Sequence, residues 1–229
     1  MVQKLPPLQE VNHNILLIDD DKHYAYHLPW CTDALKQQLS DKIRLYTDAG
    51  WWVMKSVPQA TLMLCIPKKS RRNDNMVKDV TPFPDQDQIR MDVARVKYHS
   101  KINLLNTYEQ VRIELEDIWK TAFAIIYGTY ISLVMQQGDC NAPATFQHLM
   151  TVIFGDHIGC FIYVYFDDIF IFSDMLEEHE LHLWTVFQIL EEADFHLEQE
   201  KCDMYTEKLS CLGHLIDQRG IHTDRDNMS

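Results

Sequence analysis

The sequence predicts an α+β domain in which short antiparallel strands form a sheet and amphipathic helices cover it. Residues 161–172 are an apolar, β-branched and aromatic run interrupted by two adjacent carboxylates, Asp167 and Asp168. This pattern indicates a hairpin of two buried strands. Residues 176–193 instead carry apolar side chains three and four positions apart, which is the spacing of one helix face.

The same reasoning predicts the other elements. Thr32 is a suitable N-cap for a helix that buries Leu35, Leu39 and Ile43, and Gly50 is placed to end it. We also expect a buried strand over 61–66, a helix over 85–96, a strand over 100–104, a strand that alternates through Val111, Ile113 and Leu115, a hairpin of 119–123 with 128–130, and a helix after Asn141.

The composition is that of a globular protein of one or two domains. The chain has 229 residues, of which 46% are hydrophobic and 24% charged. The longest nearly apolar run, 121–135, is too short to cross a bilayer, and no signal sequence opens the chain. We therefore expect an intracellular, cytoplasmic protein without membrane contact. The six cysteines form no Cys-x-x-Cys pair, so reduced thiols are expected rather than zinc.

The formal net charge of −13 argues mildly against tight, non-specific binding of nucleic acid. The charges are unevenly distributed, because lysines and arginines cluster between residues 55 and 78 and glutamates between residues 177 and 200. A basic face on an acidic body can still bind a phosphate backbone.

Asp167 and Asp168 are the candidate site. Two neighbouring carboxylates at the end of a buried ribbon repel each other, and burying them without partners is costly. A positive charge should therefore lie beside them, and a pair of divalent cations is the solution used in two-metal polymerases and nucleases. A polar hairpin turn without a function is the alternative.

Two other polar clusters favour a structural interpretation. The run from Asp19 to Asp21 has no spacing of a calcium loop and indicates a solvated turn. His179 and His182 lie three residues apart on the predicted helix 176–193, but no third zinc ligand accompanies them. We expect a solvated helix face there.

The residues Tyr165, Phe166, Asp167 and Asp168 resemble the Tyr-x-Asp-Asp box of reverse transcriptases, as found in retroviruses and gypsy-class LTR retrotransposons. Further blocks follow the order of that family over nearly the whole chain. They are 100–104 with 108–113, 119–123, 135–147, 178–180 with Leu183, 201–202, and 211–216.

This resemblance implies a right-hand polymerase fold, with an antiparallel palm sheet backed by helices, interleaved fingers and a truncated thumb. The implied divisions are a lead-in segment at 1–30, fingers and palm at 31–216 with the palm at about 79–110 and 149–216, and the start of the thumb at 217–229. RNase H and integrase segments are not expected.

The implied activity is RNA-directed DNA synthesis, in which a dNTP is joined to a primer 3′-hydroxyl on an RNA or DNA template. The implied cofactor is Mg²⁺, with Mn²⁺ as an alternative, and the rest of a polyprotein is a possible partner. Asp167 and Asp168 would be metal ligands and catalytic residues, with the backbone carbonyl of Leu104. Tyr108 would lie beneath the nucleotide sugar, although a core tyrosine is the alternative. The other implied contacts are Gln137, Gly138, Lys68 and Lys69 for the substrate, and Leu212, Gly213 and His214 for the primer grip.

Two departures from the family bear on activity. Asn103 stands where the family has the third metal-binding carboxylate, so an anion is replaced by a neutral amide. The fingers hairpin that should follow Lys69 is missing, and Arg71 and Arg72 are either partial substitutes for its phosphate-binding arginine or exposed loop residues. A gene-model error is a third explanation of the gap.

Two hypotheses result. The first is a polymerase fragment of weak activity, and the second is an inactive retroelement remnant that at most binds nucleic acid or protein. Asn103, the missing hairpin and the missing RNase H segment favour a poor or inactive enzyme.

Overall fold

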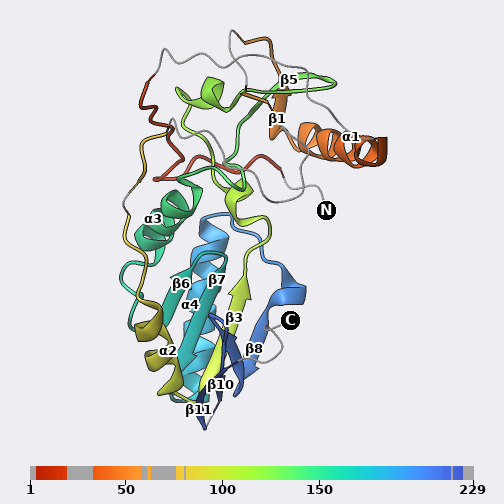
Figure 1. Cartoon of the computed structure of the whole chain (residues 1–229). Helices are drawn as coiled ribbons and strands as arrows, with labels where there is room; N and C mark the ends of the chain where they lie inside the picture. Colours follow the sequence, from red (N-terminus) through yellow and green to blue (C-terminus); the bar gives the residue numbers. More distant parts are fainter. Residues whose placement is uncertain are drawn as a thin grey trace. The chain divides into compact units, whose positions relative to one another are not determined.

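The chain folds into two compact units, each described here by itself. Unit 1 contains residues 1–79 and 108–145, and unit 2 contains residues 80–107 and 146–229. Helix α3 (Ala142–Phe154) and the 3₁₀ helix η1 (Thr107–Gln110) include residues of both units. The computed structural model, drawn in Figure 1, describes residues 4–19, 33–57, 61–62, 76–79, 81–217 and 219–223.

Unit 1 is organised around a four-stranded sheet of order β1-β5-β4-β2. Strand β5 pairs antiparallel with β1 and β4, and β2 pairs parallel with β4. Its elements are α1 (Asp33–Asp48), β1 (Trp52–Met54), β2 (Thr61–Leu62), the 3₁₀ helix η2 (Ile118–Thr121), β4 (Phe123–Ile125) and β5 (Gly128–Ser132).

Aromatic rings join helix α1 to this sheet. The ring of the buried Trp52 lies 4.7 Å from that of Tyr46 on α1 and 4.8 Å from that of Phe123 on β4, both edge to face. The helix predicted from Leu39 and its neighbours is thus confirmed, and Gly50 follows it with φ +75°, which only glycine adopts without strain. The predicted N-cap Thr32 lies outside the described residues.

The strand predicted through Val111, Ile113 and Leu115 is wrong. Ile113 pairs only singly with His13, and Arg112 pairs only singly with Val134. Val111 and Ile113 are buried, but Leu115 is 62% exposed. The alternation therefore reflects burial between two neighbouring segments and not a continuous strand ladder.

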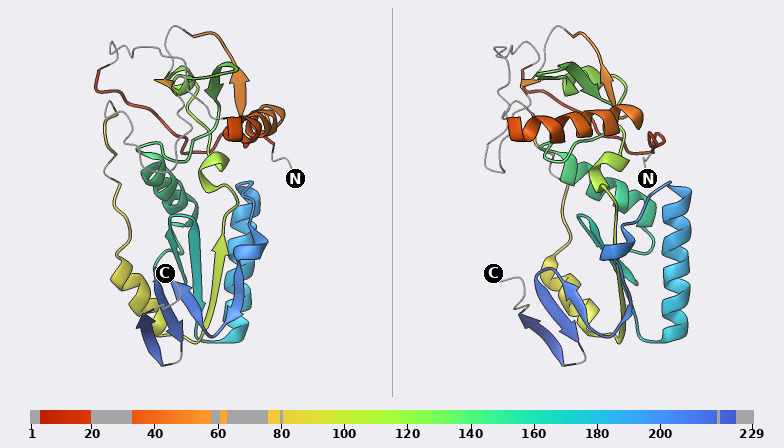
Figure 2. Two further views of the ribbon diagram at one scale, coloured as in Figure 1. Left: turned by 45° about the vertical axis from the view of Figure 1, so that its right-hand side comes forward. Right: turned by 90° about the vertical axis from the view of Figure 1, so that its right-hand side faces the viewer.

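Unit 2 holds a four-stranded, fully antiparallel sheet of order β6-β7-β3-β8, followed by a three-stranded sheet of order β11-β10-β9. Helix α4 covers one face of the larger sheet, and α2 with the smaller sheet covers the other (Figures 1 and 2). The bounds are α2 (Gln86–Ala94), β3 (Tyr98–Asn103), β6 (Ile162–Tyr165), β7 (Asp168–Ser173), α4 (Leu176–Glu192), the 3₁₀ helix η3 (Gln199–Lys201), β8 (Asp203–Thr206), β9 (Leu209–Cys211), β10 (His214–Asp217) and β11 (Gly220–Thr223).

The two faces of strand β7 have different partners because side chains alternate along a strand. Phe170 and Phe172 pack against Ile89 and Val93 of α2 and against Leu209 of β9. Ser173, on the other face, approaches α4. The predicted helices over 85–96 and 176–193 are confirmed, with the first capped by the Asp85 side chain, which accepts a 2.8 Å hydrogen bond from the backbone of Asp87.

The prediction of a solvated face at His179 and His182 is wrong. His179 is fully buried, and its two ring nitrogens lie 2.8 Å from the Ser100 hydroxyl and 2.9 Å from the Ser173 hydroxyl. His182 lies 2.7 Å from the same Ser173 hydroxyl and stacks on the Phe161 ring. His179 stands one turn before Leu183, so it extends the apolar stripe of α4, and the two serines satisfy its polar atoms.

Within the described ranges, no helix is long and apolar enough to cross a membrane. The cysteines described there are free thiols, with Cys140 and Cys160 exposed and Cys211 buried.

His179 should make the fold sensitive to acid. Burial, with the nearby His99 and His182, lowers its pKa to about 4. The unfolded chain therefore takes up a proton below about pH 6.5 that the folded chain refuses until about pH 4, so this stability is complete above pH 6.5 and is lost as the pH falls through that window. The expected loss from His179 is about 3 kcal/mol in the free energy of unfolding.

Urea unfolding at about pH 7.5 and about pH 4.5 measures most of this loss, because the first value lies above the window and the second lies near its lower end. His179→Gln should reduce the difference between the two pH values, whereas His148→Gln, at an exposed histidine, should retain it. An equal difference in all three proteins would contradict the role given to His179.

Candidate active site

The acidic hairpin is formed by β6 and β7 and closed by a two-residue turn. Tyr165 pairs with Asp168, which leaves Phe166 and Asp167 as the turn. The predicted Asp-Asp turn is thus displaced by one residue, and Asp168 is the first residue of a strand. Phe166 has φ +51°, a left-handed conformation that a non-glycine residue adopts only at a cost.

Strand β3 brings two further polar residues to Asp168. Asn103 lies directly opposite Asp168 in the β3–β7 ladder, and its side-chain amide donates a 3.1 Å hydrogen bond to Asp168 Oδ1. Lys101 stands two residues earlier on the same face, with Nζ 2.8 Å from Asp168 Oδ2. Asp168 thus meets a nitrogen donor at each carboxylate oxygen. The side chains of Lys101 and Asp168 are 20% and 26% exposed, so this ion pair is shielded from most of the solvent.

Asp167 has the opposite environment. Its Oδ1 atom is buried and has no hydrogen-bond partner. Burial raises the pKa of Asp167, the charge of Asp168 raises it further, and the polar Thr107 side chain nearby opposes the rise. Of the two carboxylates, Asp167 is therefore the one that lacks a compensating positive charge in contact with it.

Backbone contacts hold Leu104 beside the turn. The Leu104 amide donates a 3.4 Å hydrogen bond to the Asp167 carbonyl, and the Leu104 carbonyl accepts one of 3.1 Å from the Thr107 hydroxyl. In the part of the chain that the structure describes, no group of three or more His, Cys, Asp or Glu side chains is arranged to hold a metal ion.

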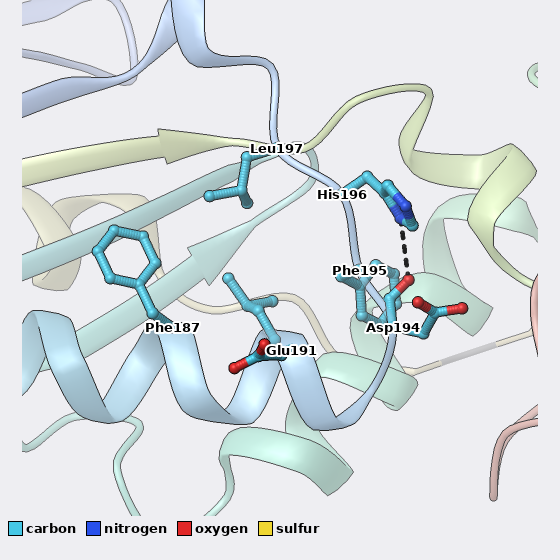
Figure 3. A pocket seen from close by; sticks show the side chains of 7 residues that line it. Phe187, Glu191, Asp194, Phe195, His196 and Leu197 are labelled. Atoms are coloured by element: carbon cyan, nitrogen blue, oxygen red, sulfur yellow. Dashed lines mark hydrogen bonds between the residues drawn. The ribbon is translucent and has the colours of Figure 1, made fainter. Parts of the chain in front are cut away.

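The segment that follows α4 fixes the end of β3. The Leu105 amide donates a 2.9 Å hydrogen bond to the His196 carbonyl. The Glu198 amide donates another of 2.9 Å to the Asn103 carbonyl. The same segment lines an open pocket at the end of α4, shown in Figure 3, where His196 Nδ1 lies 3.1 Å from the Asp194 carbonyl oxygen. The pocket is apolar apart from Glu191, Asp194 and His196.

The predicted primer-grip residues form a tight hairpin in the same unit. Leu212 and Gly213 are the turn between β9 and β10, with φ +50° and +77°, the pair of positive angles typical of a type I′ turn. Leu212 packs against the cluster around Phe170, and His214 is the first residue of β10. The residue preceding the turn, Cys211, is buried, which raises the pKa of its thiol to about 12.

The predicted nucleotide contacts Tyr108, Gln137 and Gly138 belong to unit 1. Tyr108 is half-buried in η1, whereas Gln137 and Gly138 are exposed. Lys68 and Lys69, and the place of the missing fingers hairpin, lie outside the described residues. The structure therefore brings together Asp167, Asp168 and Leu104 within unit 2.

Lys101 is the residue of this site that the sequence reasoning missed. A signal was present, because a lysine two positions before Asn103 on a strand must share its face. A single cation in an otherwise apolar and neutral strand indicates an anionic partner across the sheet.

The fold is that of retroviral polymerases. A structure of the foamy viral protease-reverse transcriptase in complex with an RNA/DNA hybrid superposes with a TM-score of 0.81 at 22% sequence identity, covering 97% of this chain and 32% of that one. The same viral protein in complex with dsDNA gives a TM-score of 0.80 over 95% of this chain and 48% of that one. The right-hand polymerase fold, with fingers, palm and antiparallel sheets, is thus confirmed.

The sequence identifies the family within that fold. The model of the family described as "Reverse transcriptase (RNA-dependent DNA polymerase)" matches residues 59–216, more than half of the chain. This protein belongs to the reverse transcriptase family.

Its relatives are retrotransposon polyproteins. It is 33% identical over 173 residues to the retrovirus-related Pol polyprotein from transposon 297 of Drosophila melanogaster, covering 74% of this chain and 16% of the polyprotein. It is 26% identical over 244 residues to that from transposon gypsy of the same organism, covering 99% of this chain and 23% of the polyprotein. The second alignment is longer than the chain, so it contains gaps in this sequence.

The Lys101–Asp168 pair should be energetically coupled. In a double-mutant cycle of Lys101→Met and Asp168→Asn, we expect a coupling of about 1 kcal/mol in the free energy of unfolding, because the pair is short and mostly shielded. Lys97 and Glu207 provide the matched control, since their charged atoms are 3.9 Å apart and both side chains are about half exposed. That cycle should give no measurable coupling, and equal values for the two pairs would contradict the geometry described.

Proposed function

We propose that the chain is the polymerase part of a retroelement reverse transcriptase and that its acidic turn is the site of RNA-directed DNA synthesis. One observation carries the proposal: Asp167 and Asp168 sit at the turn of a buried hairpin, directly beside the end of β3, in a member of the reverse transcriptase family. In this proposal unit 1 belongs to the fingers and unit 2 is the palm up to residue 216. The predicted start of the thumb, 217–229, lies partly outside the described residues.

The residues present fit a divalent cation at Asp167, because a buried carboxylate oxygen without a partner is the chemistry that Mg²⁺ or Mn²⁺ satisfies. Asp167 and the Leu104 carbonyl would hold the cation, with Asp168 as a supporting anion. When bound, the cation would activate the primer 3′-hydroxyl and stabilise charge on the transferred phosphate. Asp167, with no donor on Oδ1, is the carboxylate available for this role.

The remaining predicted residues would position the substrates. Leu212, Gly213 and His214 would hold the primer terminus, and Tyr108 would support the sugar of the incoming dNTP. Gln137, Gly138, Lys68 and Lys69 would contact the rest of the nucleotide. The partners are thus a primer on an RNA or DNA template, the dNTP, and the remainder of a polyprotein, and the site of action is the cytoplasm.

Asn103 lowers the expected rate. Its amide donates to Asp168 where the family has an anion, so the site has one negative charge fewer. Replacing a residue that only hydrogen-bonds to a metal ligand already costs about 10- to 100-fold in metal affinity or activity. We therefore expect a slow polymerase at best.

A second candidate is binding of a primer–template without synthesis. It is favoured by the two nitrogen donors on Asp168, which compensate that carboxylate without any bound ion. Both candidates require the same surface for nucleic acid and differ only in the chemical step.

Primer extension on an RNA template separates the two candidates. With Mg²⁺ and the four dNTPs, we expect trace extension by the natural chain, at least about 10-fold more by Asn103→Asp, and none by Asp167→Asn. The magnitude follows from restoring a metal-binding anion. Binding of a fluorescent primer–template, followed by anisotropy, should change little between the three proteins.

Each other outcome has a definite meaning. Binding without extension in both the natural chain and Asn103→Asp, with cooperative melting intact, would favour the second candidate. Extension that persists in Asp167→Asn would refute the assigned site.

A further inference from the structure

We propose that the Lys101 ammonium takes the place of a second divalent cation at Asp168, so that this chain binds a single divalent cation, at Asp167. The inference rests on the proposed function, because it concerns the metal chemistry of the same site. It assigns Lys101 a positioning role that follows from the strand register.

Both carboxylate oxygens of Asp168 already accept from a nitrogen donor. The ammonium group of Lys101 lies 2.8 Å from Oδ2, and the Asn103 amide donates to Oδ1 over 3.1 Å. A divalent cation at Asp168 would have to compete with these two donors for the same carboxylate. It would also lie against the Lys101 ammonium, and like charges in contact repel strongly where solvent is partly excluded.

The position of Lys101 is fixed by more than its charge. Lys101 pairs with Phe170 in the β3–β7 ladder, and its ammonium lies 5.8 Å from the centre of that buried ring. A cation over an aromatic face is attracted to it, and the aliphatic stem of a lysine packs well against a ring. The ladder therefore holds Lys101 beside Asp168.

Asp167 offers the complementary environment. Its Oδ1 is buried and lacks any hydrogen-bond donor, and it lies on the turn beside Leu104, whose amide binds the Asp167 backbone. A carboxylate in that position needs a positive partner. Different cations thus compensate the charges of the two adjacent carboxylates, an ammonium at Asp168 and a divalent ion at Asp167.

Counting bound Mn²⁺ by electron paramagnetic resonance tests this assignment without requiring activity. The full-length chain is titrated with Mn²⁺ alone, and bound ions are compared between variants, because other surface carboxylates contribute a background common to all of them. Three variants carry the test: Asp167→Asn, the neutral double replacement Lys101→Met with Asp168→Asn, and the double replacement Lys101→Met with Asn103→Asp.

We expect Asp167→Asn to bind one ion fewer than the natural chain. The Lys101→Met/Asp168→Asn protein should retain that ion, with a dissociation constant within about threefold, because it loses a mutually neutral pair. The Lys101→Met/Asn103→Asp protein should bind one additional ion, since Asp168 is released and a third carboxylate is added. Lys97→Met with Glu207→Gln, a neutral replacement of an exposed pair, should match the natural chain.

The proposal is overturned if Asp167→Asn loses no ion, if the Lys101→Met/Asp168→Asn protein loses one, or if Lys101→Met/Asn103→Asp gains none. Thermal melts confirm that each protein is folded, and Lys101→Gln replaces Lys101→Met in a double variant that fails to melt cooperatively. Absence of primer extension would refute the proposed function while leaving these ion counts unchanged, so the two failures are distinguishable.

Discussion

The antiparallel register between β3 and β7 is the constraint on which the site depends. It places Asn103 opposite Asp168 and Lys101 on the same face, and it leaves Asp167 in the turn. A shift of β3 by one residue would send Lys101 and Asn103 to the face opposite Asp168, because the side-chain period of a strand is two. The register is secured from both sides of the sheet, by the apolar cluster with α2 and by the contacts of α4.

The buried histidine of α4, His179, shows how the second side is secured. Ser100 and Ser173 come from neighbouring strands, and His179 joins them through its two ring nitrogens. This polar link has directional geometry, which an apolar contact lacks, so it fixes the helix along its axis as well as against the sheet. The segment after α4 then binds the backbone around Asn103.

Much of this arrangement could be predicted from the sequence, and the exceptions have physical causes. The apolar faces of the helices and the strands of the acidic hairpin follow from the spacing of apolar residues in the sequence. Helices α1, α2 and α4 and the β6–β7 pair were therefore predictable. The segment around Ile113 shows the same alternation without forming a strand, because burial between two segments produces the pattern of a strand. His179 was misplaced because a histidine in an apolar stripe can be recognised as buried only once its serine partners, 79 and 6 residues away, are known.

At the site, the acidic pair and Asn103 were evident from sequence blocks, but the unequal environments of the two carboxylates were not. That inequality depends on which strand face each side chain occupies and on a lysine whose partner is 67 residues later, as the 2.8 Å contact between Lys101 and Asp168 reveals. The left-handed conformation of Phe166 likewise depends on the turn closing one residue earlier than two consecutive aspartates suggest.

Asparagine and aspartate have nearly the same size and shape, so the ladder at Asn103 accommodates either residue. The amide even gains a hydrogen bond to its neighbour across the strands. Selection for a folded protein would therefore not remove this exchange from a lineage, and descent could carry it in copies that remain well folded. Conversely, the single substitution Asn103→Asp adds an anion beside Asp168 without any repacking of the core.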